Sequence, residues 1–234
     1  QLLRTRVIFD IVSFVLQARD LRRTRKVERN YIVEDDYHRD VHDYNAAVTS
    51  GKGITTTRRA EDMYHILTQP PRDVANEELL IVGPRNILEL YLAWLHGFSW
   101  RNIRGIDLYS TNPKIQPMNM EDMSFEDGTF DAISMAATLA YADDTFKALS
   151  EANRVLRPGG RFVFAVTYDP ADERWRGSRI TGAEIREMLG RLGLEIYFYS
   201  SRDKINVAGD QQTSHRFAVR KPDPEIVPLD PLAL

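Results

Sequence analysis

The sequence predicts an α/β fold, with an open, mostly parallel sheet of seven strands, helices on both faces and an N-terminal helical extension. Three observations support this prediction. Short apolar runs alternate with longer amphipathic segments from about residue 78 to residue 221. Several runs are almost continuously apolar, as parallel strands covered on both faces are. The last two runs have no helix between them, so we expect them to pair antiparallel.

The expected elements follow from these runs and from the residues that end them. Gly83 and Pro84 bound the first run, and the stretch 157–160, Arg-Pro-Gly-Gly, stops a helix. Thr181 and Glu184 have the spacing of a capping box at a helix start. The stretch 109–113 is expected to form an open loop. We expect strands at 79–82, 103–106, 115–118, 130–135, 161–166, 194–199 and 216–220, and helices at 87–96, 144–156 and 181–192.

A charged, helix-rich segment precedes the sheet and ends at the tandem prolines Pro70 and Pro71. Apolar residues recur at helical spacing over 2–20, and two further helices are expected at 37–48 and 58–67. We therefore divide the chain into an N-terminal helical extension or cap (1–76), an α/β domain (77–222) and a C-terminal tail (223–234). The apolar face of 2–20 could pack on its own domain or on a second copy, so a homodimer is left open.

Composition excludes several classes of function. The 234 residues carry a formal net charge of -3, which provides no attraction to nucleic acid or to an anionic membrane. The absence of cysteine excludes disulfides, thiolate metal sites and cysteine nucleophiles, and it fits a reducing, cytoplasmic setting. No apolar run approaches the roughly 20 residues that span a bilayer. The chain begins with Gln1, which is compatible with trimming of a natural N-terminus and of any signal on it.

Two residues at the ends of neighbouring strands point to a nucleotide cofactor. Ligands of such sheets bind beyond the carboxyl ends of the strands, where the strand order reverses. Gly83 follows the first strand, where a glycine lets the backbone approach a ligand and the next helix offers free N–H groups. Asp107 closes the second strand, where a carboxylate suits the two hydroxyls of a ribose. Many dinucleotide enzymes share this pair, so it does not identify the cofactor.

Two longer stretches do identify a cofactor. The stretch 119–131 resembles the segment of class I S-adenosylmethionine-dependent methyltransferases that passes the adenine and leads into the fourth strand. The stretch 151–161 resembles the helix and turn before their fifth strand. With Gly83 and Asp107, these stretches stand in the family's order and cover residues 78–220. The chain is similar to the broad small-molecule branch called type 11, which implies a Rossmann-like fold and S-adenosyl-L-methionine as the cofactor.

The resemblance implies roles for individual residues. Asp107 would hold the ribose, with Leu108 beside it against the adenine. Asn119 stands where the family usually has an aspartate that contacts the adenine amino group, and its amide oxygen can still accept that hydrogen bond. Met120 would contribute its backbone N–H and an apolar face, and Ala136 would lie under the methionine part of the cofactor. The implied cofactor contacts are Gly83, Pro84, Arg85, Asp107, Leu108, Asn119, Met120, Glu121 and Ala136.

The cofactor loop departs from the family pattern. That loop is usually rich in glycine and preceded by an acidic residue, whereas here Gly83-Pro84-Arg85 follows Ile81-Val82. One interpretation is a lost cofactor site. The other is a subgroup variant in which Arg85, a planar and permanent cation, holds the cofactor's carboxylate. Related sequences with Gly-Pro-Arg at this place and Leu-Ala-Tyr after the fourth strand, as at 139–141, favour the variant.

Each candidate group on the acceptor side has a plainer interpretation. Tyr141 and Asp143 could orient or deprotonate a nucleophile, or they lie in the N-cap region of the following helix. His38 and His42 share a helix face and could bind a metal or face the substrate, or they form an exposed polar face. The segment 168–179 around Trp175 could frame the acceptor pocket or form a surface loop. We expect no metal and assign no catalytic residue.

The sequence therefore predicts methyl transfer from S-adenosylmethionine to an O or N atom of a small molecule or sugar. The alternative is a catalytically inactive, methyltransferase-like module that serves as a binding or scaffold subunit. A nicotinamide-dependent dehydrogenase is disfavoured because the loop lacks Gly-x-Gly-x-x-Gly.

Overall fold

The structure is a computed structural model. It describes residues 35–51, 58–84, 86–110, 112–205 and 209–225, together with positions 11, 15, 29 and 30. The helix expected over 2–20 lies outside the described residues except at Ile11 and Val15, which are helical and exposed. Arg85 and residues 226–234 of the tail also lie outside them.

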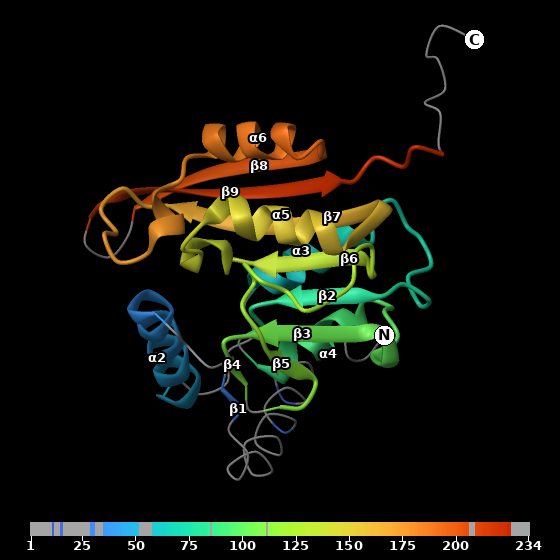
Figure 1. Cartoon of the computed structure of the whole chain (residues 1–234), viewed down its shortest axis with the longest axis horizontal. Helices are drawn as coiled ribbons and strands as arrows, with labels where there is room; N and C mark the ends of the chain where they lie inside the picture. The colour runs from blue at the N-terminus through green and yellow to red at the C-terminus, as the bar shows by residue number, and fades with distance from the viewer. Residues whose placement is uncertain are drawn as a thin grey trace, which may run out of the picture.

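Seven strands form one open sheet, as the sequence predicts (Figure 1). The five neighbouring strands that begin the sheet are mutually parallel, and the sixth runs antiparallel to both of its neighbours. The order of the strands reverses between β2 and β6, which is where such sheets bind ligands. In spatial order the strands are β5 (Ile115–Pro117), β3 (Ile103–Asp107), β2 (Leu79–Val82), β6 (Phe130–Ala136), β7 (Leu156–Tyr168), β9 (Gln211–Arg220) and β8 (Glu195–Ile205).

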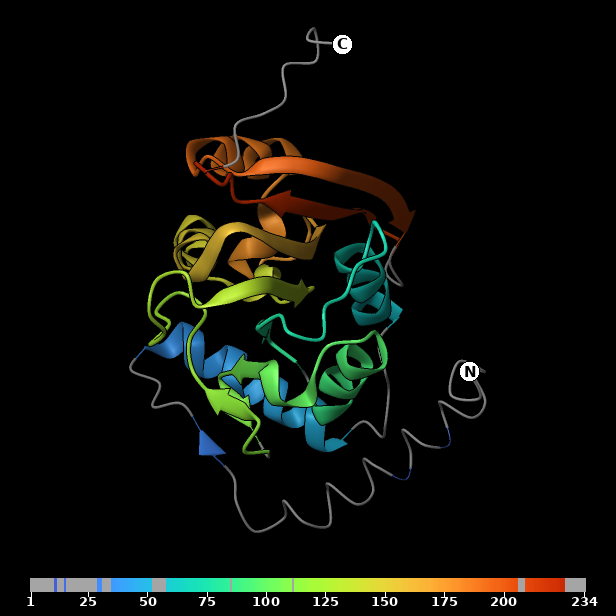
Figure 2. The same cartoon turned by 90° about the vertical axis from the view of Figure 1, so that its right-hand side faces the viewer.

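Helices cover both faces of this sheet (Figure 2). α3 (Arg58–Leu67) and α4 (Ile87–Leu95) pack on one face, and α5 (Thr145–Val155) and α6 (Gly182–Arg191) pack on the other. Alternate residues of β2 divide between the two cores, because successive side chains of a strand point to opposite faces. α3 precedes the predicted boundary at residue 77 but packs on β6 and β7. The proposed division of the chain stays a prediction.

Side chains at the helix starts satisfy backbone N–H groups that the helices leave unpaired. Asn86 caps α4 by accepting a hydrogen bond from the Leu88 N–H at 2.9 Å. Asp144 caps α5 by accepting one from the Lys147 N–H at 3.0 Å. The predicted capping box between Thr181 and Glu184 is present at the start of α6. Asp144, and not Asp143, is therefore the cap of α5.

Two parts of the chain differ from expectation. β8 and β9 extend beyond their apolar cores as one ladder that ends at the pair Ile205–Gln211. The distal half of this ladder is polar. Strand pairing needs only backbone hydrogen bonds, so the apolar pattern of the sequence did not predict this half. The stretch 109–113 is also not wholly a loop, because β4 (Tyr109–Ser110) pairs antiparallel with β1 (Arg29–Asn30). That partner comes from a distant part of the chain and leaves no local signal.

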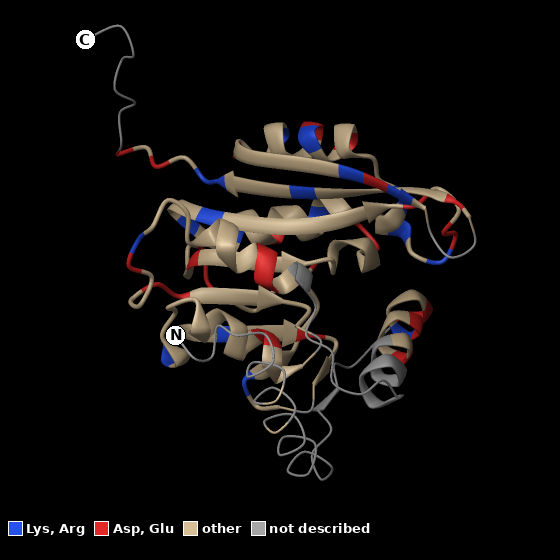
Figure 3. Cartoon of the chain, turned by 180° about the vertical axis from the view of Figure 1, so that it is seen from behind, with Lys and Arg blue, Asp and Glu red and all other residues tan. Residues whose placement is uncertain are grey.

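α2 (Asp36–Gly51) confirms the helix expected at 37–48 and lies beyond the carboxyl ends of β2 and β3 (Figure 1). Asp36, Asp40 and Asp43 of this helix are exposed. Figure 3 shows acidic residues in red along the helix. Among the helices that the structure describes, none combines the length and the apolar character needed to cross a bilayer. α2 is the element that brings the N-terminal segment to the binding edge of the sheet.

Candidate functional site

A pocket opens at the carboxyl ends of β2 and β3, where the strand order reverses. Five of the predicted cofactor contacts line it, and the other lining residues come from β2, β3, the stretch after β5, the turn after β6, and α2. The described residues that line the pocket are His38, Val41, Val82, Gly83, Ile106, Asp107, Leu108, Met118, Asn119, Met120, Thr138 and Tyr141. The sequence therefore located this pocket through its strand ends.

Gly83 makes a tight turn that no other residue could make in this setting. Its φ of +68° lies in the left-handed region, and its N–H donates to the Ile106 carbonyl at 2.8 Å. A Cβ at this position would lie 2.1 Å from Thr138 Oγ1. That hydroxyl stands within hydrogen-bond distance of the carbonyls of Val82 (3.2 Å) and Gly83 (3.3 Å). The loop is thus clamped against the end of β6 by Thr138.

The carboxylate of Asp107 lies at the end of β3 and lines the pocket. Its Oδ1 accepts a hydrogen bond from the Tyr109 N–H at 3.3 Å, and its carbonyl accepts one from the Met118 N–H at 2.9 Å. The second bond ties the end of β3 to the end of β5. Leu108 is buried beside it and lines the same pocket. The strand end therefore presents an acid and an apolar side chain together.

The stretch after β5 forms the third side of the pocket. Asn119 Oδ1 accepts a hydrogen bond from the Glu121 N–H at 3.0 Å, which folds this stretch into a tight turn. Met120 is buried and lines the pocket. Glu121 is also buried, and its Oε1 accepts a hydrogen bond from the Asp143 N–H at 2.6 Å. Glu121 therefore braces the turn after β6 against this stretch.

Four predicted cofactor contacts are placed differently from the five in the pocket. Pro84, Glu121 and Ala136 are not among the described residues that line it, and Arg85 lies outside the described residues. Pro84 is buried and faces Gly105 of β3, where an added Cβ would meet its ring at 3.1 Å. Ala136 ends β6 and packs with the core on the α3 side. Their roles toward a cofactor stay predictions.

α2 contributes two pocket residues that the strand pattern did not predict. His38 and Val41 lie on its inner face, and both are buried. Asp35 fixes the histidine by accepting hydrogen bonds from its backbone N–H (2.9 Å) and at its Nδ1 (2.6 Å). His42 turns elsewhere, toward Asp43 at 2.9 Å and with its ring 5.8 Å from that of Tyr109. In the described part of the chain no three acidic or histidine side chains gather as metal ligands.

An aromatic cluster closes the side of the pocket next to α2. Tyr37, Tyr44, Tyr141 and Trp175 pack ring against ring, with centroid distances of 5.1 to 6.4 Å. Trp175 is buried, so the segment 168–179 packs here and is not only a surface loop. Tyr141 faces the pocket, as the sequence suggested for an acceptor-side group. The cluster joins α2 to the turns after β6 and β7.

Polar contacts reinforce this junction. The Tyr37 hydroxyl lies 3.3 Å from the Ala142 carbonyl and accepts a hydrogen bond from the Arg176 N–H at 3.1 Å. The Arg176 guanidinium pairs with Asp143 and lies 4.8 Å from the centroid of the Tyr37 ring. Burial raises the pKa of the Tyr37 phenol, and the nearby Asp143 charge raises it further. The phenol is therefore neutral near pH 7 and serves as a hydrogen-bonding strut.

The family described as "Methyltransferase domain" matches residues 97–164, which run from the end of α4 into β7. This range contains Asp107 and Asn119, but not Gly83. The ubiquinone/menaquinone biosynthesis C-methyltransferase of Brucella canis is 51% identical over 45 residues, a stretch that covers 19% of this chain and 17% of that protein. That stretch thus spans less than a fifth of the relative's length.

Solved structures share the fold over most of the chain. The 1,6-didemethyltoxoflavin-N1-methyltransferase of Burkholderia thailandensis, solved with S-adenosylhomocysteine, has a TM-score of 0.58 at 15% identity and covers 84% of this chain and 95% of its own. The cyclase SpnF has a TM-score of 0.58 at 16% identity and covers 83% of this chain and 100% of its own. At such identities, these likenesses establish the fold alone.

Proposed function

We propose that the chain is a class I S-adenosylmethionine-dependent methyltransferase and that it transfers a methyl group to an O or N atom of a small molecule or sugar. The observation that carries this proposal is the pocket at the ends of β2 and β3. It gathers Gly83, Asp107 and Asn119 from three separate strand ends. These are the residues that the family resemblance assigns to the cofactor loop, the ribose and the adenine.

The chemistry of the lining fits this cofactor. Gly83 presents bare backbone at the loop, since Thr138 occupies the space that a side chain would need. Asp107 offers carboxylate oxygens suited to a pair of ribose hydroxyls. Apolar side chains suited to an adenine ring lie nearby, namely Val82, Ile106, Leu108 and Met120. When bound, S-adenosylmethionine supplies a methyl group already activated by its sulfonium charge.

The chain's own residues then need to position the acceptor and exclude water. α2 and Tyr141 cover one side of the pocket, and the aromatic cluster behind them packs ring against ring. Orientation of two reacting groups in such a site can supply much of the rate, so the proposal assigns no general base. The raised pKa of Tyr37 argues against that phenol as a base.

The kind of atom that accepts the methyl group is a separate part of this proposal. An O or N acceptor is favoured by the polar side chain of Tyr141, which lines the pocket. The name of one fold neighbour states an N-methyltransferase, and the name of the Brucella relative states a C-methyltransferase. Incubation with methyl-labelled cofactor and a panel of sugars, amines and phenols, read by mass spectrometry, identifies the methylated atom. Transfer only to carbon would correct this part of the proposal.

Calorimetric titration with S-adenosylhomocysteine tests the cofactor directly. We expect one saturable site with a Kd well below about 1 mM. No heat of binding at about that concentration would overturn the proposal.

A second candidate, an inactive binding or scaffold module, is favoured by the loop that keeps one glycine. Asp107→Ala discriminates between the two. We expect it to weaken S-adenosylhomocysteine binding about 100-fold, since hydrogen bonds to a charged group contribute ~1.5–3 kcal/mol each. It should abolish label transfer as well. Glu187→Ala, at an exposed carboxylate of α6, serves as the control. A protein that binds the ligand but transfers no label to any acceptor supports the scaffold.

A further inference from the structure

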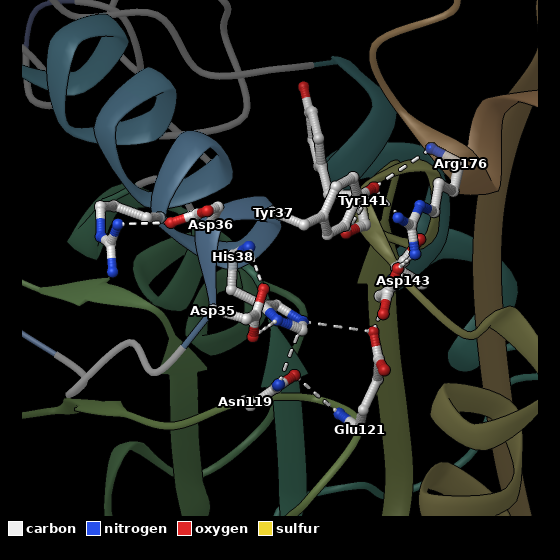
Figure 4. Close-up of polar contacts among 11 residues, drawn as sticks. Asp35, Asp36, Tyr37, His38, Asn119, Glu121, Tyr141, Asp143 and Arg176 are labelled. Atoms are coloured by element: carbon white, nitrogen blue, oxygen red, sulfur yellow. Dashed lines mark hydrogen bonds and ion pairs between the residues drawn. The ribbon is translucent and has the colours of Figure 1, made fainter.

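The imidazole of His38 is held at both ring nitrogens (Figure 4). Nδ1 lies 2.6 Å from Asp35 Oδ2, and Nε2 lies 3.2 Å from Asn119 Nδ2. His38 is 8% exposed and lines the pocket, although it belongs to α2 and stands 81 residues from Asn119 in the chain. Its contact with Asn119 joins α2 to the stretch after β5.

The two neighbours fix the tautomer of the ring. An ionised carboxylate can only accept hydrogen bonds, so Asp35 places the proton of the neutral imidazole on Nδ1. Nε2 then carries a lone pair, and its partner must be a donor. The amide nitrogen of Asn119 is that donor, and the amide oxygen already accepts from the Glu121 N–H at 3.0 Å. The opposite orientation of the amide would set two donors against each other at Glu121.

We propose that His38, held by Asp35, is a positioning residue for the cofactor: it fixes the Asn119 amide so that its oxygen faces the adenine amino group. This inference rests on the proposed function. An aspartate has two acceptor oxygens and works in either orientation, whereas an asparagine has one acceptor and one donor. The asparagine at this position therefore needs an external partner to hold its orientation. α2 supplies that partner from outside the sheet.

Glu121 is a third neighbour of the ring. Its Oε1 lies 3.6 Å from His38 Nε2, and both side chains are nearly buried. The same oxygen accepts a hydrogen bond from the Asp143 N–H at 2.6 Å, and the Asp143 carboxylate pairs with Arg176. Asp35, Asn119 and Glu121 therefore surround the ring and fix its position in the pocket.

The test is a double-mutant cycle on the full chain, with S-adenosylhomocysteine as the probe in calorimetric titrations at pH 8. His38→Leu removes the acceptor, and we expect affinity to fall about tenfold, which corresponds to one hydrogen bond of ~1.4 kcal/mol. Asn119→Asp places a carboxylate next to the Nε2 lone pair, so its own affinity is measured and serves as the reference for the second background. In the Asn119→Asp background, His38→Leu should cost less than about twofold, because a carboxylate needs no orientation. His42→Leu, on the same helix and outside the pocket, is the matched control.

Rescue by a conservative variant supplies a readout that a merely structural role would not move. His38→Gln keeps an acceptor near the Asn119 amide nitrogen, so it should restore most of the affinity that His38→Leu loses. If His38→Leu does not fold, His38→Phe, which keeps a ring but no ring nitrogen, takes its place in the cycle. The inference is overturned if His38→Leu lowers the affinity for S-adenosylhomocysteine equally in the parent and Asn119→Asp backgrounds, or does not lower it at all. Failure of the parent protein to bind at all overturns the proposed function instead, so the two failures are distinguishable.

Discussion

The pocket has two walls of different origin. The sheet wall consists of Gly83, Asp107, Asn119 and Met120, which lie at the ends of parallel strands or just after them. The helix wall consists of His38 and Val41, which α2 brings from the N-terminal segment, and Tyr37 of the same helix supports it from outside the pocket. The first wall is built into the sheet by its topology. The second is held on by side-chain contacts such as those from Tyr37 to Ala142 and from His38 to Asn119.

This difference teaches how each wall can be altered. Residues of the sheet wall cannot move without moving a strand, since backbone hydrogen bonds fix the loop at Gly83 to Ile106 and join Asp107 to Met118. Residues of the helix wall depend on a few hydrogen bonds and one aromatic cluster. Local unfolding occurs most readily in regions that have few buried contacts. We expect substitutions in the sheet wall to damage folding and binding together, and those in the helix wall to change binding or local opening alone.

The largest effect is expected at Gly83. Gly83→Ala should lower the free energy of unfolding by ~3 kcal/mol and remove S-adenosylhomocysteine binding. The reason is that the new Cβ combines a strained positive φ with a contact of 2.1 Å to Thr138 Oγ1. Denaturant unfolding and the calorimetric titration measure the two quantities.

Gly193→Ala separates the effect of backbone strain from that of a steric clash with Thr138. Gly193 has the same φ of +68°, but an added Cβ would meet nothing within 4 Å. Its substitution should cost only ~1–2 kcal/mol and leave binding intact. Equal losses at the two glycines would mean that backbone strain, and not the Thr138 clamp, makes Gly83 necessary.

The two walls also differ in how far the sequence predicts them. Strand ends are local signals, so the apolar run before Gly83 and the one before Asp107 placed both residues at the ends of strands. Asp107, Leu108, Asn119 and Met120 lie in the pocket as expected. The structure also shows that Asp143 is not the N-cap of α5, because Asp144 caps that helix.

The helix wall was beyond the reach of local patterns. A spacing of four between His38 and His42 predicts a shared helix face, but it does not say which ring meets the sheet. That depends on the docking of α2 on residues about 80 to 140 positions away, such as Asn119 and Arg176. The one available signal was Asp35 three residues before His38, a spacing suited to a hydrogen bond at a helix start. The pairing of β1 with β4 was hidden for the same reason.

An intermediate effect is expected where the sheet wall is anchored to α5. Glu151 Oε2 accepts a hydrogen bond from the Met123 N–H at 2.8 Å, and Arg154 donates to Glu151 at 2.7 Å and to the Met123 carbonyl at 2.7 Å. The hydrogen bonds from Arg154 hold the pKa of the Glu151 carboxyl below its ordinary value. Glu151→Gln should therefore lower the free energy of unfolding at pH 7 by ~1–2 kcal/mol.

The pH dependence of stability follows from the direction of that shift. A carboxyl whose pKa is lower in the folded state contributes stability above its unfolded pKa of about 4.3, and this contribution is lost as the pH falls through the folded value. The free energy of unfolding should therefore fall less steeply between pH 7 and pH 3 for Glu151→Gln than for the parent protein. Glu187→Gln, at an exposed position of α6, should leave the slope unchanged. An equal fall of the free energy of unfolding with pH in Glu151→Gln and in the parent protein would contradict the assigned role.

The smallest effect is expected at Tyr37 and tests whether the walls open separately. Tyr37→Phe removes the hydroxyl between the Ala142 carbonyl and the Arg176 N–H but keeps the ring in the aromatic cluster. We expect hydrogen exchange of the α2 amides to accelerate about fivefold, which corresponds to the ~1 kcal/mol of one hydrogen bond. Exchange in β2 and β3 should not change. Tyr44→Phe is the matched control, because that ring lies in the same cluster and its hydroxyl has no hydrogen-bond partner among the described residues. If β2 and β3 accelerate with α2, the helix and the sheet open as one cooperative unit, and the contrast between the two walls is one of origin and not of stability.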